Sequence, residues 1–209
     1  MDDTQSSSAK PMEVGPINVD RLGTLERNRL GMSLFLLSEA VFFAVLILSY
    51  IYFRDSPANA DGPTAANSLN PLVSAIYTAC LIASSGTIWL ADRALDRGED
   101  GRLRLWLLAT VALGGVFLFG QGQEYIRLLN AQVTVSRDLF GTTFFTLTGF
   151  HGFHVFCGLV ALLILFGLAL AGAFKGKRAS PAVTAISLYW HFVDVVWIVL
   201  FTIIYIWRT

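Results

Sequence analysis

Five long apolar blocks, almost free of charge, constrain the fold of this chain more than any other feature of its sequence. The blocks are Leu30–Phe53, Leu72–Ala91, Leu105–Gln123, Leu139–Phe174 and Ala179–Trp207. Apart from three histidines, the only acidic or basic residues within them are Glu39 and Asp194. A helix needs about 20 mostly apolar residues to cross a bilayer. The blocks therefore predict an all-α integral membrane bundle of five transmembrane helices, with spans at about 30–53, 72–91, 105–127, 140–173 and 181–207.

The segment before the first block is polar and predicts a tail, not a folded domain. Residues 1–29 lack the short apolar core of a signal peptide, and the first block is long enough to stay in the membrane as a helix. We therefore divide the chain into a polar cytoplasmic tail, 1–29, and a five-helix transmembrane domain, 30–209. The sequence shows no internal repeat, which disfavours the transporter folds that are built from repeats.

The basic residues are distributed unevenly between the two sides of the expected membrane. If the N-terminus is cytoplasmic, eleven of the 15 Lys and Arg residues fall on the cytoplasmic side and four on the outer side. This asymmetry fits the positive-inside rule, so we predict a cytoplasmic N-terminus and an outer C-terminus. Because the basic residues do not gather on one soluble face, we expect no nucleic-acid partner.

Ionisable side chains inside a span are costly, and by default they face protein or water and have a role. The candidates are Glu39, Glu124, His151, His154, His191 and Asp194. In the fourth span, Thr148, His151 and His154 follow the spacing of one helix face, and His191 and Asp194 do so in the fifth. Stripes of this kind are typical of buried faces between hydrogen-bonded helices. Either stripe could also hold a cofactor.

The depths of these groups along their helices suggest which of them meet. At about 1.5 Å per residue, His191 lies roughly 15 Å above the turn between the last two spans, and His154 about 30 Å. This difference in level disfavours a bis-histidine haem within the chain. We predict two polar layers instead, an inner layer of Glu39, His191 and Asp194 and an outer layer of Gln121, Glu124, His151 and His154. Alternatively, Glu124 pairs locally with Arg127, three residues further on.

Small residues and cysteines within the spans have structural explanations. Ala79, Ala83 and Gly86, and later Gly115 and Gly158, are spaced for close approach of helix backbones. Cys80 and Cys157 also lie within spans, so we expect small buried hydrophobes and neither a disulfide nor a thiolate metal site. For Glu39, two interpretations stay open. It is either a proton-handling or partner-contacting acid, or a neutral carboxyl that is hydrogen-bonded to a neighbouring helix.

Six segments, in chain order, resemble subunit III of the haem–copper respiratory oxidases. They are GMSLFLLSEAVFFA (31–44), SLNPLVSA (68–75), SSGTIW (84–89), QGQEY (121–125), FGTTFFTLTGFHGFHVFCGL (140–159) and YWHFVDVVWIVLFTIIYIW (189–207). Together they extend over about residues 30–207, and the combination of HGxH with YWHFVDVVW is highly specific. Within the family, these segments lean towards the cytochrome c type of oxidase.

The resemblance implies a multi-pass subunit of the bacterial cytoplasmic membrane that packs on subunit I and supports assembly, proton uptake and stability of the complex. It implies no catalytic residue, metal site or redox centre in this chain, with haem and copper in partner subunits. Subunit II, a small subunit IV and bound phospholipid are the other expected partners. The family's intramembrane glutamate maps onto Glu39. The other motif positions, expected to make polar, lipid or interhelix contacts, are Gln121, Glu124, Tyr125, His151, His154, Trp190, His191, Asp194 and Trp197.

The chain departs from the fuller members of this family, which have seven spans and hold lipid between the first two and the other five. Only the last five are present here, as in five-helix bacterial members, so the lipid cleft is expected to be open to the bilayer or filled by another subunit. Other functions remain open. They are a quinol oxidase subunit III, an accessory protein of nitric oxide reductases, a membrane di-haem cytochrome that uses the histidines, and a small proton-coupled transporter.

Overall fold

The computed structural model describes residues 19–54, 71–131, 139–177 and 179–207. The regular elements in these ranges are helices: α1 (Val19–Arg54), α3 (Pro71–Asp96), α4 (Asp100–Asn130), α5 (Leu139–Leu170), α6 (Pro181–Phe201) and the short π-helix η2 (Thr202–Ile206). Five helices in the described ranges are long and apolar enough to cross a membrane, which confirms the predicted fold class. Residues 1–18 of the predicted tail lie outside the described residues.

Local sequence signals explain where the helices begin and end. α1 begins at Val19, within the segment predicted as a polar tail. α3 continues past Ala91, where the predicted apolar block ends, to Asp96. Gly98 then adopts a positive φ of 72°, and its N–H donates to the Leu95 carbonyl at 2.8 Å. This left-handed conformation, which glycine adopts without strain, closes α3 before α4 starts. Pro181 opens α6 at its first turn, as the sequence predicts.

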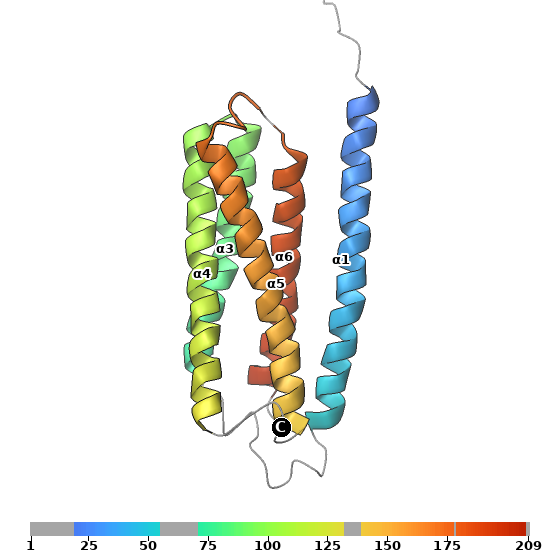
Figure 1. Cartoon of the computed structure of the whole chain (residues 1–209), viewed down its shortest axis with the longest axis vertical. Helices are drawn as coiled ribbons and strands as arrows, with labels where there is room; N and C mark the ends of the chain where they lie inside the picture. The colour runs from blue at the N-terminus through green and yellow to red at the C-terminus, as the bar shows by residue number, and fades with distance from the viewer. Residues whose placement is uncertain (1–18, 55–70, 132–138, 178, 208–209) are drawn as a thin grey trace, which may run out of the picture.

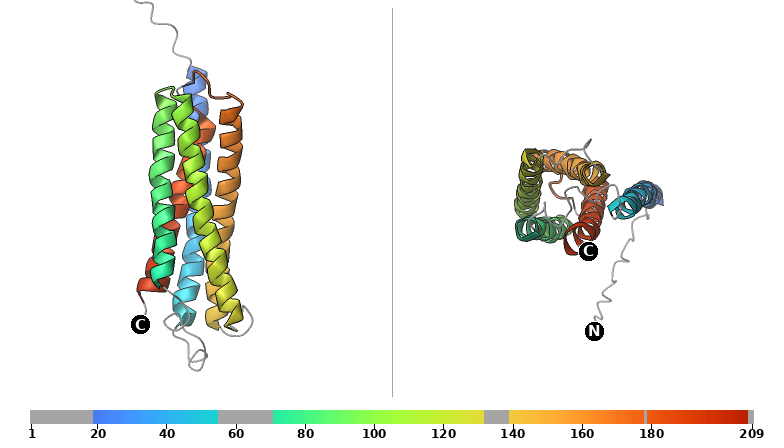
Figure 2. Two further views of the ribbon diagram at one scale, coloured as in Figure 1. Left: turned by 90° about the vertical axis from the view of Figure 1, so that its left-hand side faces the viewer. Right: turned by 90° about the horizontal axis from the view of Figure 1, so that it is seen from below.

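The helices divide into a four-helix bundle and one outer helix. Figure 1 and Figure 2 show α3, α4, α5 and α6 at the corners of a bundle, with α1 outside it, and α1 packs along α5 and α6. Over residues 30–54 of α1, many large side chains face outward, Leu34 and Val41 among them, whereas Phe43 and Tyr50 are buried against the bundle. An apolar outer surface of this extent is what contact with lipid requires.

The centre of the bundle is organised around the indole of Trp190 on α6, which is completely buried. Its Nε1 donates a hydrogen bond to Ser84 Oγ on α3 at 2.9 Å. Gly114 on α4 and Gly158 on α5 lie against the ring, because a Cβ on either would come within 2.8 Å of indole carbons. Trp190 thereby joins all four bundle helices. The predicted close approach at Gly158 is confirmed, whereas at α4 the close residue is Gly114 and not the neighbouring Gly115.

The far end of α1 is joined to the end of the chain. Arg54, the last residue of α1, donates from Nη1 to the backbone carbonyl of Trp207 at 3.0 Å. Its guanidinium also lies over the Trp207 ring, 4.9 Å from the centroid. These contacts bring the last residue of α1 next to Trp207, the residue that follows η2. They lie at the end of the molecule that Figure 1 shows at the bottom. The register of α1 against the bundle is therefore fixed at this end.

Candidate functional site

The intramembrane acid Glu39 pairs with a histidine of the bundle. Glu39 on α1 and His154 on α5 meet with Oε2 and Nε2 3.1 Å apart. The other ring nitrogen of His154, Nδ1, lies 2.7 Å from the backbone carbonyl of Phe150. The His154 carbonyl in turn accepts a hydrogen bond from the Tyr189 hydroxyl at 2.9 Å. The pair is thus oriented from both α5 and α6.

The geometry requires one proton between Glu39 and His154. A backbone carbonyl is only an acceptor, so Nδ1 of His154 carries a hydrogen and donates to Phe150. In the neutral ring, Nε2 is then an acceptor and Glu39 must supply the proton. In the charged ring, Nε2 donates to an ionised carboxylate. Both arrangements are neutral overall, which suits a pair in the middle of an apolar bilayer.

This pairing corrects the predicted polar layers, which placed Glu39 in the inner layer and His154 in the outer one. Glu39 lies fifteen residues before the end of α1, and His154 fifteen residues after the start of α5. The end of α1 and the start of α5 lie at the same end of the molecule, at the bottom of Figure 1. Glu39 and His154 therefore both lie roughly 22 Å from that end along their helices. The prediction measured depth from helix ends that were placed where the apolar blocks end at charged residues. In the structure, however, α1 extends back to Val19 and α5 already ends at Leu170.

The predicted alternative for Glu124, a local pair with Arg127, is present. Arg127 Nη2 donates to Glu124 Oε1 at 2.9 Å. The same carboxylate accepts hydrogen bonds from Ser74 Oγ on α3, at 3.0 and 3.1 Å, and from the Tyr205 hydroxyl at 2.6 Å. Glu124 therefore ties α3 and the end of α6 to α4. Tyr205, on the π-helix η2, is part of this cluster.

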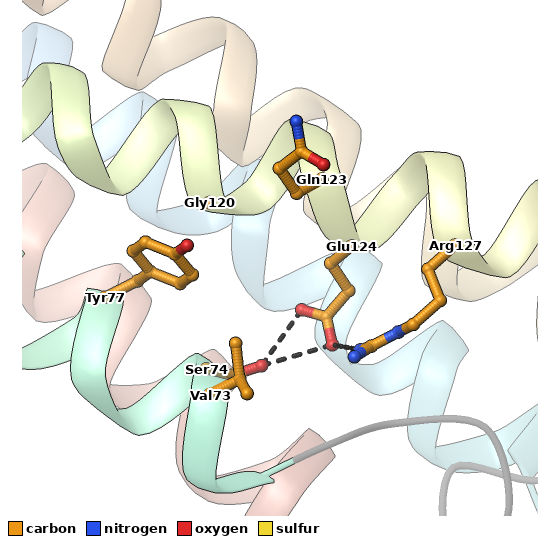
Figure 3. Close-up of a pocket in the computed structure, with 7 residues that line it drawn as sticks. All are labelled: Val73, Ser74, Tyr77, Gly120, Gln123, Glu124 and Arg127. Carbon is orange, nitrogen blue, oxygen red and sulfur yellow. Dashed lines mark hydrogen bonds and ion pairs between the residues drawn. The ribbon is translucent and has the colours of Figure 1, made fainter.

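A small pocket opens beside this cluster, between α3 and α4. Its volume is about 240 Å³, and Gly120 on α4 lies close to the ring of Tyr77 in its wall. Figure 3 shows the Glu124 carboxylate held between Ser74 and Arg127 at one side of the pocket. The Arg127 side chain is 44% exposed and the Glu124 side chain 10% exposed, so the accessible charge of this pocket is positive.

Tyr125 and Gln121 lie one turn apart on α4. The Tyr125 hydroxyl and Thr148 Oγ1 on α5 are 2.7 Å apart, which joins α4 to α5. Gln121 is buried, and within the described ranges its Oε1 has no hydrogen-bond partner. The Tyr125–Thr148 hydrogen bond holds α4 against α5.

The side chains of His151 and His154 have different surroundings, although the two residues are only three apart on α5. His151 is completely buried and stacks on the indole of Trp197, with ring centroids 4.9 Å apart. In the part of the chain that the structure describes, neither ring nitrogen of His151 has a hydrogen-bond partner. Trp197 Nε1 donates to Thr78 Oγ1 on α3 at 2.9 Å. His151 therefore faces the bundle interior, whereas His154 faces α1.

His191 and Asp194 meet, as the inner layer predicts, but through Ser85 on α3. Ser85 Oγ lies 3.1 Å from His191 Nδ1 and is also hydrogen-bonded to Asp194 Oδ2. The order of the three groups places the hydroxyl between the imidazole and the carboxylate. In a Ser-His-Asp catalytic triad the imidazole occupies the middle position, so this arrangement differs from such a triad. It joins α3 to α6 near the centre of the membrane.

The hydroxyl groups of α3 are the functional partners that reasoning from the sequence missed. Ser74, Thr78, Ser84 and Ser85 bond to Glu124, Trp197, Trp190 and the His191–Asp194 pair, in that order along the helix. Ser74, Thr78 and Ser85 are spaced by four and seven residues, which is the spacing of one helix face and the signal that could have identified them. Hydropathy does not distinguish them from the apolar residues around them.

Among the described residues, no three His, Cys, Asp or Glu side chains gather in a way that could hold a metal ion. Cys80 and Cys157 are free thiols on different helices. The polar groups are instead used in pairs and small clusters that connect helices. The fold and these clusters define a multi-pass helical membrane protein in which polar side chains join the spans.

Comparisons with known proteins identify the family. Residues 23–209 match the family described as cytochrome c oxidase subunit III. The chain is 38% identical to the probable cytochrome c oxidase subunit 3 of Nocardia farcinica over 84% of this chain and 85% of the relative. It is 35% identical to the cytochrome c oxidase subunit 3 of Corynebacterium diphtheriae over 94% of both chains. The chain therefore belongs to the cytochrome c oxidase subunit III family.

One of the relatives is longer than this chain, which matches only part of its length. The chain is 38% identical to the cytochrome c oxidase subunit 3 of Heterololigo bleekeri, over 86% of this chain but only 70% of the relative. Its relatives in Nocardia and Corynebacterium are matched over most of their length. This chain thus corresponds to the shorter, bacterial members among these relatives.

Proposed function

We propose that this chain is the non-catalytic subunit III of a proton-pumping cytochrome c oxidase, where it packs on subunit I and supports assembly, proton uptake and stability. Family membership supports its place in the oxidase. The observation that carries the proposed role is the Glu39–His154 pair, which holds one proton between α1 and the bundle. The proton can move between Glu39 and His154 without changing the net charge of the pair inside the membrane.

Glu39→Gln separates the proton of this pair from its hydrogen bond. A glutamine amide can donate to Nε2 of His154, so the contact between α1 and α5 is kept. The amide cannot release a proton. We therefore expect the complex to assemble with normal haem content, to lose proton uptake at high turnover, and to inactivate after fewer turnovers than the wild type.

Ser38→Ala is the matched control, because it changes a neighbouring residue whose hydroxyl bonds only within α1, to the Phe35 carbonyl at 2.7 Å. Proton uptake, oxygen consumption and the number of turnovers before inactivation are measured for both variants in reconstituted vesicles. Uptake and lifetime in the Glu39→Gln complex equal to those of the control would leave the pair with a structural role only.

We also propose phospholipid binding at the pocket between α3 and α4, beside Glu124 and Arg127. The partly exposed guanidinium of Arg127 suits a lipid phosphate, and exposed Leu72 and Ile76 on α3 suit the acyl chains. Lipid that remains with the purified complex is quantified by mass spectrometry. Arg127→Gln is expected to reduce the bound phospholipid, and an unchanged lipid content would remove this pocket from the proposal.

The remaining parts of the proposal concern the complex and its membrane. We propose that subunit II and a small subunit IV complete the complex, with haem and copper in partner subunits. Cytochrome c is the proposed electron donor, in the bacterial cytoplasmic membrane with the N-terminus of this chain inside. Mild-detergent purification with identification of the co-purifying chains tests this composition. A subunit II with a dinuclear copper site would support cytochrome c, and its absence would favour a quinol.

A further inference from the structure

His151 is a polar side chain that the bundle buries completely and leaves without a polar partner. Its exposed fraction is 0%, and among the described residues neither Nδ1 nor Nε2 has a hydrogen-bond partner. Aromatic side chains enclose the ring. It stacks on Trp197 of α6, with centroids 4.9 Å apart, and it meets Phe117 of α4 edge-on at 6.1 Å. Buried polar groups in folded proteins almost always have a partner, so these two nitrogens require one.

The surroundings of His151 also determine its charge. A charged imidazole without an anion is far more costly to bury than a neutral one, and no described group bonds to either nitrogen of this ring. The ring is therefore neutral, with one N–H donor and one acceptor nitrogen. The two nitrogens point away from the ring in different directions, so one small molecule cannot bond to both. Each nitrogen needs a partner of its own.

Gln121 on the facing helix α4 presents a buried acceptor to the same part of the bundle. The residue is 8% exposed, and within the described ranges its Oε1 has no hydrogen-bond partner. One turn before it, Phe117 contacts the ring of His151. One turn after it, Tyr125 bonds to Thr148, three residues before His151. Because α4 and α5 pack side by side (Figure 2), Gln121 faces α5 between these two contacts and beside His151.

Water is the ligand that suits both residues. A water molecule has two hydrogens to donate and two lone pairs that accept. It can donate one hydrogen to Gln121 Oε1, and then either donate the other to the acceptor nitrogen of His151 or accept from the ring N–H. The bridge is therefore possible whichever nitrogen carries the hydrogen. A metal ion would need more ligands, and the described residues contain no group of three His, Cys, Asp or Glu side chains that could supply them.

We infer that the bundle encloses a site for structural water at His151, with one water molecule on each ring nitrogen, and that one of the two bridges the ring to Gln121 Oε1. This bridge joins α5 to α4 and does not depend on the proposed function. Phe43 of α1 closes the site on the side of the Glu39–His154 pair, because its ring contacts both histidines, at 6.4 Å for His151 and 5.1 Å for His154. Structural water typically bonds to buried polar groups that the protein leaves unsatisfied.

Radiolytic labelling of the purified complex locates water of this kind. An X-ray pulse splits bound water into hydroxyl radicals, which oxidise the nearest side chains even where bulk solvent does not reach, and mass spectrometry measures the oxidation rate of each residue. Trp197, 2% exposed, is the reporter. Trp190, 0% exposed on the same helix, is the matched control, because its indole bonds directly to Ser84. We expect Trp197 to be oxidised several-fold faster than Trp190.

Two variants connect this label to the site. His151→Phe keeps an aromatic ring beside Trp197 but removes both nitrogens, so the oxidation rate of Trp197 should fall to that of Trp190. Gln121→Leu removes the acceptor at similar size and should also lower the rate, which provides the readout if His151→Phe does not assemble. Wild-type Trp197 that is oxidised no faster than Trp190, or as fast in the assembled variants as in the wild type, would overturn the inference.

A double-mutant cycle tests the bridge itself. In the wild-type background, Gln121→Leu leaves the bridging water without one of its partners, so the thermal midpoint of the complex should fall. In the His151→Phe background the bridge is already absent, and the same change should lower the midpoint clearly less. Gln123→Leu, at an exposed glutamine two residues further on, is the control and should have the same effect in both backgrounds. Equal effects of Gln121→Leu in the two backgrounds would refute the bridge.

Discussion

Adding one methyl group at Gly114 tests whether Trp190 is packed as tightly as the structure shows. A Cβ at this position would lie 2.7 Å from Cζ2 and 2.8 Å from Cη2 of the Trp190 indole. Ordinary contact begins at 3.4 Å, so the ring would have to move by several tenths of an ångström. It cannot move freely, because Gly158 lies against it and Ser84 holds its Nε1 at 2.9 Å.

Gly115→Ala is the matched control for Gly114→Ala, since the two glycines are adjacent in the same helix. A Cβ at Gly115 would meet nothing within 4 Å. Both changes gain up to about 1 kcal/mol of helix propensity, and this term cancels when the two variants are compared. Overpacking a core typically costs about 1–3 kcal/mol, which is therefore the expected difference in stability between them.

The measurement is the thermal unfolding midpoint of the purified complex in one detergent, followed by helical circular dichroism. At about 2–4 °C per kcal/mol, we expect Gly114→Ala to melt roughly 2–12 °C below Gly115→Ala. In a Trp190→Phe background, which removes the Cζ2 and Cη2 edge, the difference should largely vanish. Equal midpoints of the two glycine variants, or a difference that persists in the Trp190→Phe background, would refute the packing argument.

Two further predictions concern hydrogen bonds between helices. Thr78→Val keeps the shape of the side chain but leaves the buried Trp197 Nε1 without its acceptor, so we expect a loss of about 1–3 kcal/mol. Thr146→Val, which removes an exposed hydroxyl that bonds only within α5, should leave the melting midpoint nearly unchanged. Tyr205→Phe should cost about 1.5–3 kcal/mol, because it removes a bond to a carboxylate, and clearly less in a Glu124→Gln background. Equal costs in the two backgrounds would contradict this pairing.

The number of helices could be predicted because apolar length alone decides whether a segment can span a bilayer. Some helix ends, such as the start of α1 and the end of α3, could not, since the apolar blocks were ended at charged residues. α3 continues through Asp92 and Arg93, which are charged yet accommodated: Asp92 accepts a hydrogen bond from Ser187 at 2.6 Å, and the Arg93 guanidinium lies 3.8 Å from the centroid of the Trp89 ring. Charged residues near the end of a span can therefore remain helical when a neighbouring side chain forms a hydrogen bond or a cation–π contact with them.

The titratable members of the candidate site were predicted from the sequence, whereas only some of their pairings were. His191 and Asp194 were placed together correctly, and the local pair of Glu124 with Arg127 was foreseen as an alternative. Glu39 was assigned to the wrong partners. Depth along a helix is known from sequence only relative to the helix end, and the eleven residues between the predicted start of the first span at 30 and the start of α1 at Val19 correspond to roughly 16 Å, about the separation of the two predicted layers. Which helices are neighbours was not available at all.

The position of α1 gives the Glu39–His154 pair a second consequence. An apolar helix in lipid gains little from the hydrophobic effect by packing on other helices, because lipid is equally apolar. Specific contacts must therefore fix its register. Arg54 does so at one end, through Trp207, and the pair does so fifteen residues earlier, near the middle of the membrane. Loss of the shared proton would leave either an unpaired carboxylate or two acceptors facing each other, so the protonation of the pair and the docking of α1 are coupled.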